Sequence, residues 1–253
     1  MLILLPPSES KTGRPRGRAL DLDALSFPSL TAARAQVIAA LAAVGTGPDA
    51  HATLGVSPGL VDEVARNTVL DTAAALPASR VYTGVLYDAL DLASVTGVAR
   101  RRANRWIVIV SALFGAVRPT DHIPPYRLSM AVNLPGVGPL AGYWRPALED
   151  EMKAAAGNGL VIDCRSSTYA AAWTPSGTAA RMWVQIRVPG ATHMAKHTRG
   201  LVARHLLEAE REPKTPAALA EVLESAFDVA LTEPAKPGRP WMLDASVRTT
   251  LEG

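Results

Sequence analysis

Short apolar runs alternate along this chain with longer segments that have a helical period. Residues 2–5 and 106–110 are uninterrupted apolar runs, and residues 160–164 form a third run that includes one Asp. Runs of this length predict buried strands. Residues 182–188 alternate instead, with Met182, Val184, Ile186 and Val188 on one side, which predicts a half-buried strand. Strands that alternate with helices are typical of an α/β fold.

Helical periodicity marks the segments between these strands. Residues 31–44 predict a helix that ends before Gly45, and residues 145–156 predict another that ends at Gly157. We expect strands at 81–86, 227–231 and 240–243, with the last two closing a hairpin or an edge of the sheet. The other expected segments are a helix or helix pair at 87–104 broken at Gly97, a loop at 134–144, the longest helix at 192–212 and an amphipathic helix at 216–227.

The loop after residues 106–110 carries many polar side chains. In SALFGAVRPTDHIPPYRLSM, residues 111–130, three prolines restrict the backbone and hold the polar side chains on a stiffened frame. Loops often carry function, so this one is a candidate site. The alternative is structural: Arg118 pairs with Asp121 to brace the loop, while Tyr126 and Arg127 cap a neighbouring helix.

Polar loops also follow the strands at 2–5 and 160–164. The first, PPSESKTGRPRGR, holds Ser8 and Lys11 and is similar in composition to a phosphate-binding loop, although it lacks the spacing of a Walker A motif. The second begins with Arg165, Ser166 and the segment up to Tyr169. Because ligands of α/β sheets bind at strand ends, we expect these loops to contribute to an anion site, with the arginines at 14–18 left in solvent.

Residues 54–67, LGVSPGLVDEVARN, predict two short helices joined by a Ser-Pro-Gly turn. A hairpin of this kind can present backbone N–H groups to a nucleic-acid phosphate. The LPGVG run at 134–138 has a similar appearance, but no helical pattern precedes it, so we interpret it as a loop. The arginine cluster at 100–105 does not by itself imply DNA, because cations are favoured at a helix C-terminus.

The first turns of the expected helix at 192–212 are cationic. Lys196 and Arg199 there oppose the helix dipole, which favours an anionic ligand close to them. His193 and His197 have the i, i+4 spacing of a metal-binding pair, but the segment lacks the glutamate of the zincin motif and a third ligand. We therefore predict neither a metal site nor a cofactor.

Composition narrows the class of protein. A hydrophobic fraction of 48% supports a folded core, and 253 residues fit one large α/β domain or two small ones. The 26 basic and 23 acidic residues give a net charge of only +3, so affinity for anions must come from local clusters. Cys164 is the single cysteine, which excludes an internal disulfide. Without a signal-peptide pattern or an apolar run of bilayer length, we expect a cytoplasmic protein.

Several of these motifs occur together, in the same order, in one known family. The motifs are the N-terminal strand with its Pro-Ser…Lys-Thr loop, VYTG at 81–84, the RP-x-D-x-x-x-PYRL-x-M block at 118–130, Tyr143-Trp144, VIDCRSSTYAA at 161–171 and KHTRGLVAR at 196–204. With these motifs the chain resembles the YaaA family of peroxide-stress proteins.

The resemblance implies a single compact α/β (mixed α+β) domain over residues 1–253, with a mixed central sheet flanked by helices and a basic cleft. It also implies DNA binding and protection against iron-driven oxidative damage under peroxide stress, and it places the family's helix-hairpin-helix at residues 54–67. The family's cleft residues correspond here to Lys11, Arg118, Tyr126, Arg127, Ser166, Tyr169, Lys196 and Arg199.

The chain departs from the enterobacterial members of that family after the strand at 160–164. Where those members have Asn-Leu-Ala-Ser-Asp-Glu-Tyr, this chain has DCRSSTY at 163–169, so it loses two acids, gains an Asp163–Arg165 pair and differs at Ser167 and Thr168. His197 replaces a lysine of the family. We expect these changes to redistribute charge at the cleft.

Two functions are compatible with these residues. A DNA-binding stress protein would neutralise the phosphates of double-stranded or distorted DNA, and the candidate DNA- or anion-binding residues are Ser8, Lys11, Arg118, Arg127, Arg165, Lys196 and Arg199. An enzyme would act on a nucleotide-like or other anionic small molecule, and the candidate catalytic residues are Lys11, Tyr126, Ser166, Tyr169 and Lys196. Neither hypothesis requires a membrane or an obligate protein partner.

Overall fold

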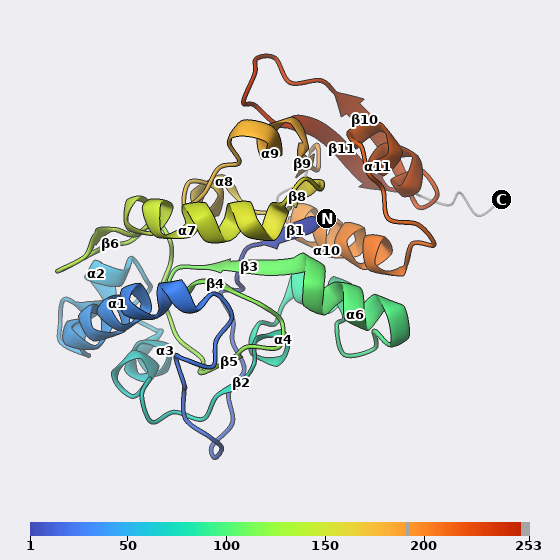
Figure 1. Ribbon diagram of the computed structural model, residues 1–253. Coiled ribbons are helices and arrows are strands. Elements are labelled where there is room, and N and C mark those ends of the chain that lie inside the picture. The colour runs from blue at the N-terminus through green and yellow to red at the C-terminus, as the bar shows by residue number, and fades with distance from the viewer. Residues whose placement is uncertain (191–192, 249–253) are drawn as a thin grey trace.

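Seven strands form one mixed sheet through the middle of the molecule (Figure 1). The computed structural model describes residues 1–190 and 193–248. The strands of the sheet are β1 (Leu2–Leu5), β3 (Ile107–Ser111), β4 (Gly115–Val117), β8 (Val161–Asp163), β9 (Trp183–Arg187), β10 (Phe227–Thr232) and β11 (Trp241–Val247). Their order is β10-β11-β9-β8-β1-β3-β4. Neighbours from β11 to β3 are parallel, while β10 and β4 close the two edges as antiparallel strands.

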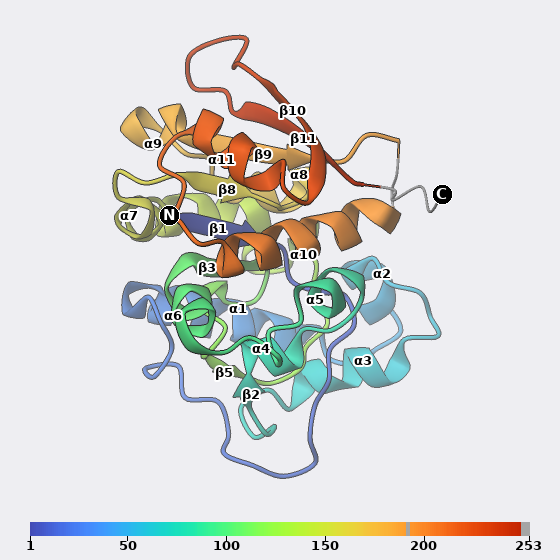
Figure 2. The same ribbon diagram turned by 90° about the vertical axis from the view of Figure 1, so that its right-hand side faces the viewer.

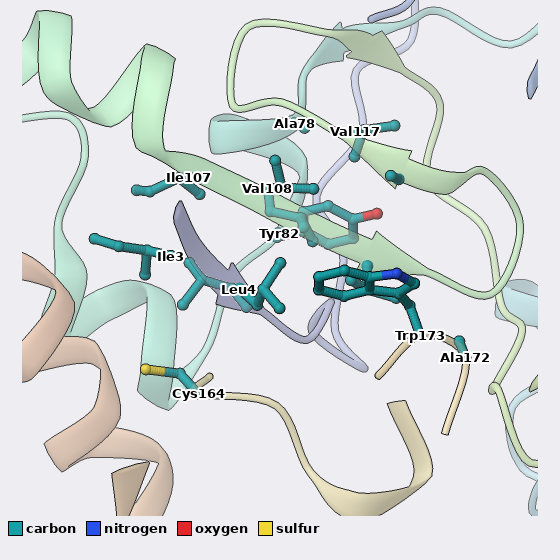
Figure 3. Close-up of a cluster of buried hydrophobic side chains, with 14 of the residues drawn as sticks. Ile3, Leu4, Ala78, Tyr82, Ile107, Val108, Val117, Cys164, Ala172 and Trp173 are labelled. Atoms are coloured by element: carbon teal, nitrogen blue, oxygen red, sulfur yellow. The ribbon is translucent and has the colours of Figure 1, made fainter. Parts of the chain in front are cut away.

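Strand β1 is buried on both faces at the centre of the parallel part. Its four residues have no exposed surface, as the uninterrupted apolar run predicts. Ile3 pairs with Ile107 on one side and with Ile162 on the other, so the strand has a partner along both edges. Figure 3 shows Ile3 and Leu4 packed beside Ile107.

Helices cover both faces of the sheet. Figures 1 and 2 show α7 and α9 on one face and α6, α10 and α11 on the other. Two small antiparallel pairs, β2 (Leu76–Pro77) with β5 (His122–Ile123) and β6 (Asn133–Leu134) with β7 (Gly138–Pro139), lie outside the main sheet. The helices are α1 (Thr31–Val44), α2 (Ala50–Leu54), α3 (Val61–Ala65), α4 (Ala78–Val81), α5 (Val85–Leu90), α6 (Gly97–Trp106), α7 (Leu140–Ala156), α8 (Ser167–Ala170), α9 (Gly177–Arg181), α10 (His193–Glu208) and α11 (Pro216–Leu223), with short 3-10 turns at Pro28–Leu30 and Arg66–Thr68.

The predicted mixed α/β fold is confirmed, as are most of its elements. The strands expected at 2–5, 106–110 and 160–164, the helix at 31–44 and the closing hairpin at 227–243 are all present. The segment 87–104 forms a helix pair as expected, but the break covers residues 91–96 and Gly97 begins α6. The two short helices around the turn at 55–60 are present too. The extent of a single domain over residues 1–253 stays a prediction.

Two expected elements are wrong. Residues 81–86 were expected as a strand, but α4 ends at Val81 and α5 begins at Val85, because Gly84 turns the backbone there with a φ of +89°. The expected loop at 134–144 contains the β6–β7 hairpin and the start of α7 at Leu140, so Trp144 belongs to a helix. Its indole N–H donates to the Ala112 carbonyl at 2.8 Å, which anchors α7 to the loop after β3.

Strand β9 is more deeply buried than its alternating pattern predicts. Val184 and Ile186 are fully buried as expected, but Trp183 on the opposite side is only 7% exposed. Its indole N–H donates to the carboxylate of Asp163 on the neighbouring strand at 3.1 Å. The strand lies inside the sheet, between β8 and β11, and its Trp183 face is buried at the start of the strand and exposed at Arg187.

Candidate anion-binding pocket

The candidate site lies at the carboxyl ends of two neighbouring parallel strands whose connections run in opposite directions. From β1 the chain proceeds toward β3, whereas from β8 it proceeds away toward β9. Connections that diverge in this way leave a crevice at the strand ends, which is where α/β sheets bind ligands. Here the crevice is a pocket of about 500 Å³, lined by the loop 6–11 after β1 and by Cys164, Ser166 and Tyr169 after β8.

One wall of the pocket is cationic. The loop after β1 contributes Lys11, the loop after β5 contributes Arg127, and the first turns of α10 contribute Lys196 and Arg199. The carboxylate of Glu9 lies 3.8 Å from Arg127 and 3.8 Å from Lys196, so it already occupies part of the space that a bound anion would take. Glu9 is 76% exposed and is therefore free to be displaced.

Another part of the pocket lining is apolar. Leu54, Gly55 and Val56 come from the end of α2 and its turn, and Val85 and Leu86 come from α5. A pocket lining with both apolar and cationic parts suits a ligand with a flat or apolar part and an anionic part.

Lys11 is the most perturbed cation of the pocket. Its ammonium group donates to the Ser8 carbonyl at 2.7 Å and lies 4.3 Å from the centre of the Tyr126 ring. Burial, together with the positive charge of Arg127, lowers the pKa of Lys11 from its ordinary value of 10.5 to about 7. Lys11 therefore exchanges its proton near neutral pH, which suits proton transfer or nucleophilic attack.

The lowered pKa of Lys11 makes stability depend on pH. Between about pH 7 and 10.5 the unfolded chain holds a proton that the folded chain has released, so the free energy of unfolding rises with pH. We expect this group to contribute up to about 1.4 kcal/mol per pH unit across that interval. Urea unfolding of the wild type and of Lys11→Met at pH 7, 8 and 9 measures it, because the free energy of unfolding of the wild type should rise with pH relative to that of the variant. A constant difference would contradict the lowered pKa.

Hydroxyl-bearing side chains line the pocket beside the cations, among them Tyr169, Ser166 and Ser8. Burial raises the pKa of Tyr169 to about 12, so its phenol keeps its proton at neutral pH and can donate a hydrogen bond to a ligand. Ser166 is exposed and occupies the position before the first turn of α8. Its hydroxyl is accessible from the pocket, and Ser8 is positioned by the N–H of Thr83, which donates to its Oγ at 3.1 Å.

Tyr126 does not reach the pocket with its hydroxyl. That group lies 2.8 Å from the Ser111 hydroxyl and 3.0 Å from the Tyr82 hydroxyl, in a chain of buried side chains. Tyr126 itself is only 2% exposed, and burial raises its pKa well above the ordinary value. The hydroxyl therefore serves the core, while the face of the ring supports the Lys11 ammonium.

Arg118 and Arg165 are directed elsewhere. The Arg118 guanidinium donates to the Arg105 carbonyl at 2.7 Å and so caps the C-terminal end of α6, while Asp121 accepts from the backbone N–H of Arg118 rather than from its side chain. Arg165 is fully buried and forms two hydrogen bonds of 2.8 Å with the carboxylate of Asp163. These contacts correct the expectation that the Asp163–Arg165 pair redistributes charge at the cleft, because the two charges neutralise each other inside the protein.

Three residues in or beside the pocket were not identified from the sequence, and the arginine cluster at 100–105 lies away from the pocket. Glu9, Thr83 and Arg66 were missed: Thr83 lines the pocket, and Arg66 donates to the Lys11 carbonyl at 3.3 Å. The VYTG motif was the available signal for Thr83. The arginine cluster lies elsewhere, since Arg102 donates to the Leu207 carbonyl at 3.0 Å and caps α10 rather than its own helix.

The helical hairpin at 54–67 borders the pocket through the end of α2. Its second helix, however, begins with Asp62 and Glu63, which stabilise that helix end themselves and repel a phosphate. The start of this second helix therefore does not favour a phosphate. His197, the other departure, is half-buried on α10, and its Nδ1 has no hydrogen-bond partner among the residues that the structure describes.

Within the described residues, no three His, Cys, Asp or Glu side chains come close enough to hold a metal ion. The described part of the chain also contains no helix long and apolar enough to cross a bilayer. The His193 side chain, half of the pair considered above, lies outside the described residues.

Known proteins resemble the chain along most of its length. A family model described as "Peroxide stress protein YaaA" matches residues 1–230. A UPF0246 protein of Streptomyces coelicolor is 48% identical over 256 residues, which cover 98% of each chain. UPF0246 proteins of Corynebacterium efficiens and Corynebacterium glutamicum strain R are 40% and 38% identical, over 89% of this chain and 93% of each relative. The chain therefore belongs to the YaaA family of peroxide stress proteins.

Proposed function

We propose that the pocket binds the phosphate-bearing part of a nucleotide, and that the chain uses it to bind DNA in which a nucleotide is displaced from the duplex. One observation carries the proposal: Lys11, Arg127, Lys196 and Arg199 come from three separate segments and line one pocket. A pocket of about 500 Å³ has the size of a small-molecule site. It accommodates one nucleotide and not a duplex, which is the reason for choosing distorted DNA over intact DNA.

Further cations favour DNA over a free nucleotide. Arg16 and Arg18 are exposed on the segment that continues from Lys11, outside the lining of the pocket. A free nucleotide has no phosphates to reach them, whereas a strand of DNA carries one phosphate on every nucleotide. The membership of the chain in a family of peroxide stress proteins supports a role on damaged nucleic acid.

Fluorescence anisotropy with labelled DNA tests the proposal. We expect gapped and bulged duplexes to bind more tightly than an intact duplex, and log K to fall with log salt by roughly 0.7–0.9 per phosphate neutralised. Arg127→Ala should weaken binding by about 10- to 150-fold, because it removes a charge-assisted hydrogen bond of about 1.5–3 kcal/mol. Arg211→Ala is the matched control, since Arg211 is 72% exposed and pairs with Glu221 outside the pocket.

Two results would contradict this proposal. One is an affinity that does not change between low and moderate salt. The other is an equal effect of Arg127→Ala and Arg211→Ala. Competition by free adenosine monophosphate distinguishes the two sources of the phosphate: if it displaces DNA at stoichiometric concentration, the pocket takes free nucleotides.

Substitution of Glu9 is expected to raise the affinity for DNA, whereas Arg127→Ala lowers it. Its carboxylate occupies the cationic wall between Arg127 and Lys196, so an incoming phosphate must displace it. Glu9→Gln should raise the affinity for DNA by about two- to fivefold, since exposed ion pairs contribute about 0.2–1 kcal/mol each. Glu221→Gln, at an exposed ion pair of Arg211, should change nothing. The same anisotropy titration measures both, and a weaker affinity of Glu9→Gln would contradict this role of Glu9.

A second candidate function is an enzyme acting on an anionic small molecule. It is favoured by Lys11, whose pKa of about 7 lies where a catalytic acid or base is most effective. Incubation of the protein with nucleotides, followed by phosphorus NMR, tests it. Turnover that Lys11→Met abolishes would support the enzyme, and unchanged spectra would leave DNA binding as the better candidate.

A further inference from the structure

The two hydrogen bonds that Lys11 donates leave the lone pair of its neutral nitrogen unused. Its two acceptors are backbone carbonyls, that of Ser8 at 2.7 Å and that of Glu9 at 3.4 Å. The Glu9 carboxylate is directed to Arg127 and Lys196 instead. A neutral amine has two N–H donors, so two carbonyl acceptors use both of them and leave the lone pair unbonded.

The surroundings of Lys11 favour the neutral form of the amine. Burial, which removes water from the ammonium group, disfavours its charge most, Arg127 and Arg66 also repel that charge, and Glu9 attracts it. Removal of water and neighbouring cations are the conditions that turn a lysine into a nucleophile. Lys11 also lines the pocket, so a ligand in the pocket reaches the nitrogen.

We propose that Lys11 is the nucleophile of a Schiff-base site that takes aldehydes or ketones bearing a phosphate or carboxylate group. This inference rests on the proposed function in one respect: the cationic wall would hold the phosphate or carboxylate group of the ligand. It adds a covalent bond between the Lys11 nitrogen and the carbonyl carbon of the ligand. In DNA, the ring-opened sugar of an abasic nucleotide is an aldehyde of this class, and a free sugar phosphate is another.

The step is balanced without an oxidant or a reductant. The lone pair of the Lys11 nitrogen forms a bond to the carbonyl carbon, the C=O double bond becomes a single bond, and a proton passes from nitrogen to the oxygen. The resulting carbinolamine loses its hydroxyl group and the second nitrogen proton as one water molecule, which leaves a C=N double bond. Tyr169 lines the same pocket in its protonated form, so its phenol can hydrogen-bond to the carbonyl oxygen during addition.

The wild-type protein and a probe aldehyde test this assignment. Pyridoxal phosphate carries an aldehyde and a phosphate, and borohydride reduces its imine to a stable secondary amine. The chain has five lysines, at positions 11, 153, 196, 214 and 236, so peptide mass mapping assigns each label. We expect Lys11 to be labelled at least tenfold faster than Lys214, which is 72% exposed and lies outside the pocket. Pyridoxal, which lacks the phosphate, should lose most of this preference.

Variants check the assignment. Lys11→Arg keeps a long basic side chain but removes the nucleophile, so it should lose the fast label, whereas Lys214→Arg should keep it. Because the map is made on the wild type, the test holds even if a Lys11 variant folds poorly. Fast labelling at Lys196 instead of Lys11, or equal labelling of all five lysines, would overturn the proposal. If Lys11 is not labelled and Arg127→Ala still weakens DNA binding, the Schiff-base inference fails while the proposed function stands.

Discussion

Replacing Asp163 with alanine is expected to lower the free energy of unfolding by about 3–5 kcal/mol. Both partners of the Asp163–Arg165 pair have side chains with no exposed surface, so the substitution leaves an unpaired charge inside the protein. It also removes the acceptor of the Trp183 indole N–H. This is one of the two largest effects we expect, because a charge buried without a partner is among the most unfavourable groups a core can contain.

Urea unfolding measures this loss, and an exposed pair provides the control. Asp244 pairs with Arg187, whose side chain is 55% exposed, so Asp244→Ala should lower stability by less than about 1 kcal/mol. The double substitution Asp163→Leu with Arg165→Met should recover much of the loss, since it removes both charges together. Equal effects of Asp163→Ala and Asp244→Ala would contradict the role assigned to the buried pair.

The Asp163–Arg165 pair also connects stability to the pocket. Arg165 donates to the carbonyls of Tyr169 at 3.3 Å and Trp173 at 2.9 Å, which fixes the turn that carries α8. Ser166 and Tyr169 lie on this turn and line the pocket. We therefore expect Asp163→Ala to weaken ligand binding as well, even though neither member of the pair lines the pocket.

Gly200→Ala is expected to lower the free energy of unfolding by about 3 kcal/mol. Gly200 lies in α10 where this helix packs against α5, and an added Cβ would overlap the Leu86 carbonyl oxygen and lie 2.9 Å from the Cβ of Ala89. The backbone oxygen cannot move aside without moving α5. Since α5 and α10 supply Leu86 and Lys196 to the pocket, binding should weaken along with stability.

Gly142→Ala is the matched control. Gly142 lies in α7, where an added Cβ meets no atom within 4 Å. Alanine there should raise stability by roughly 0.5–1 kcal/mol, because glycine loses more backbone freedom on folding. Opposite signs for the two substitutions in urea unfolding would support the close helix contact, and a gain in stability from Gly200→Ala would exclude it.

The strand and helix pattern was predictable where one local signal was enough. The apolar runs at 2–5 and 106–110 predicted buried strands, which are present as β1 and β3, and Gly157 ended its helix as expected. The pattern failed at 81–86, where β-branched and aromatic residues were interpreted as a strand. There the backbone turn at Gly84 and the packing of Val81 and Tyr82 into the core determine the conformation, and neither is a local property.

The candidate site shows what the sequence determined and what it left open. The sequence placed hydroxyls and cations directly after β1 and β8, and a sheet in which these strands are parallel neighbours brings those ends together. It could not distinguish the arginines, since Arg118, Arg127 and Arg165 all lie in polar loops after apolar strands. Only the tertiary structure decided that Arg118 caps a helix, that Arg165 pairs with a buried acid and that Arg127 faces the pocket. The reason is physical: whether a guanidinium is available to a ligand depends on which acceptors lie around it, and for Arg118 these acceptors come from a helix end that only folding brings beside it.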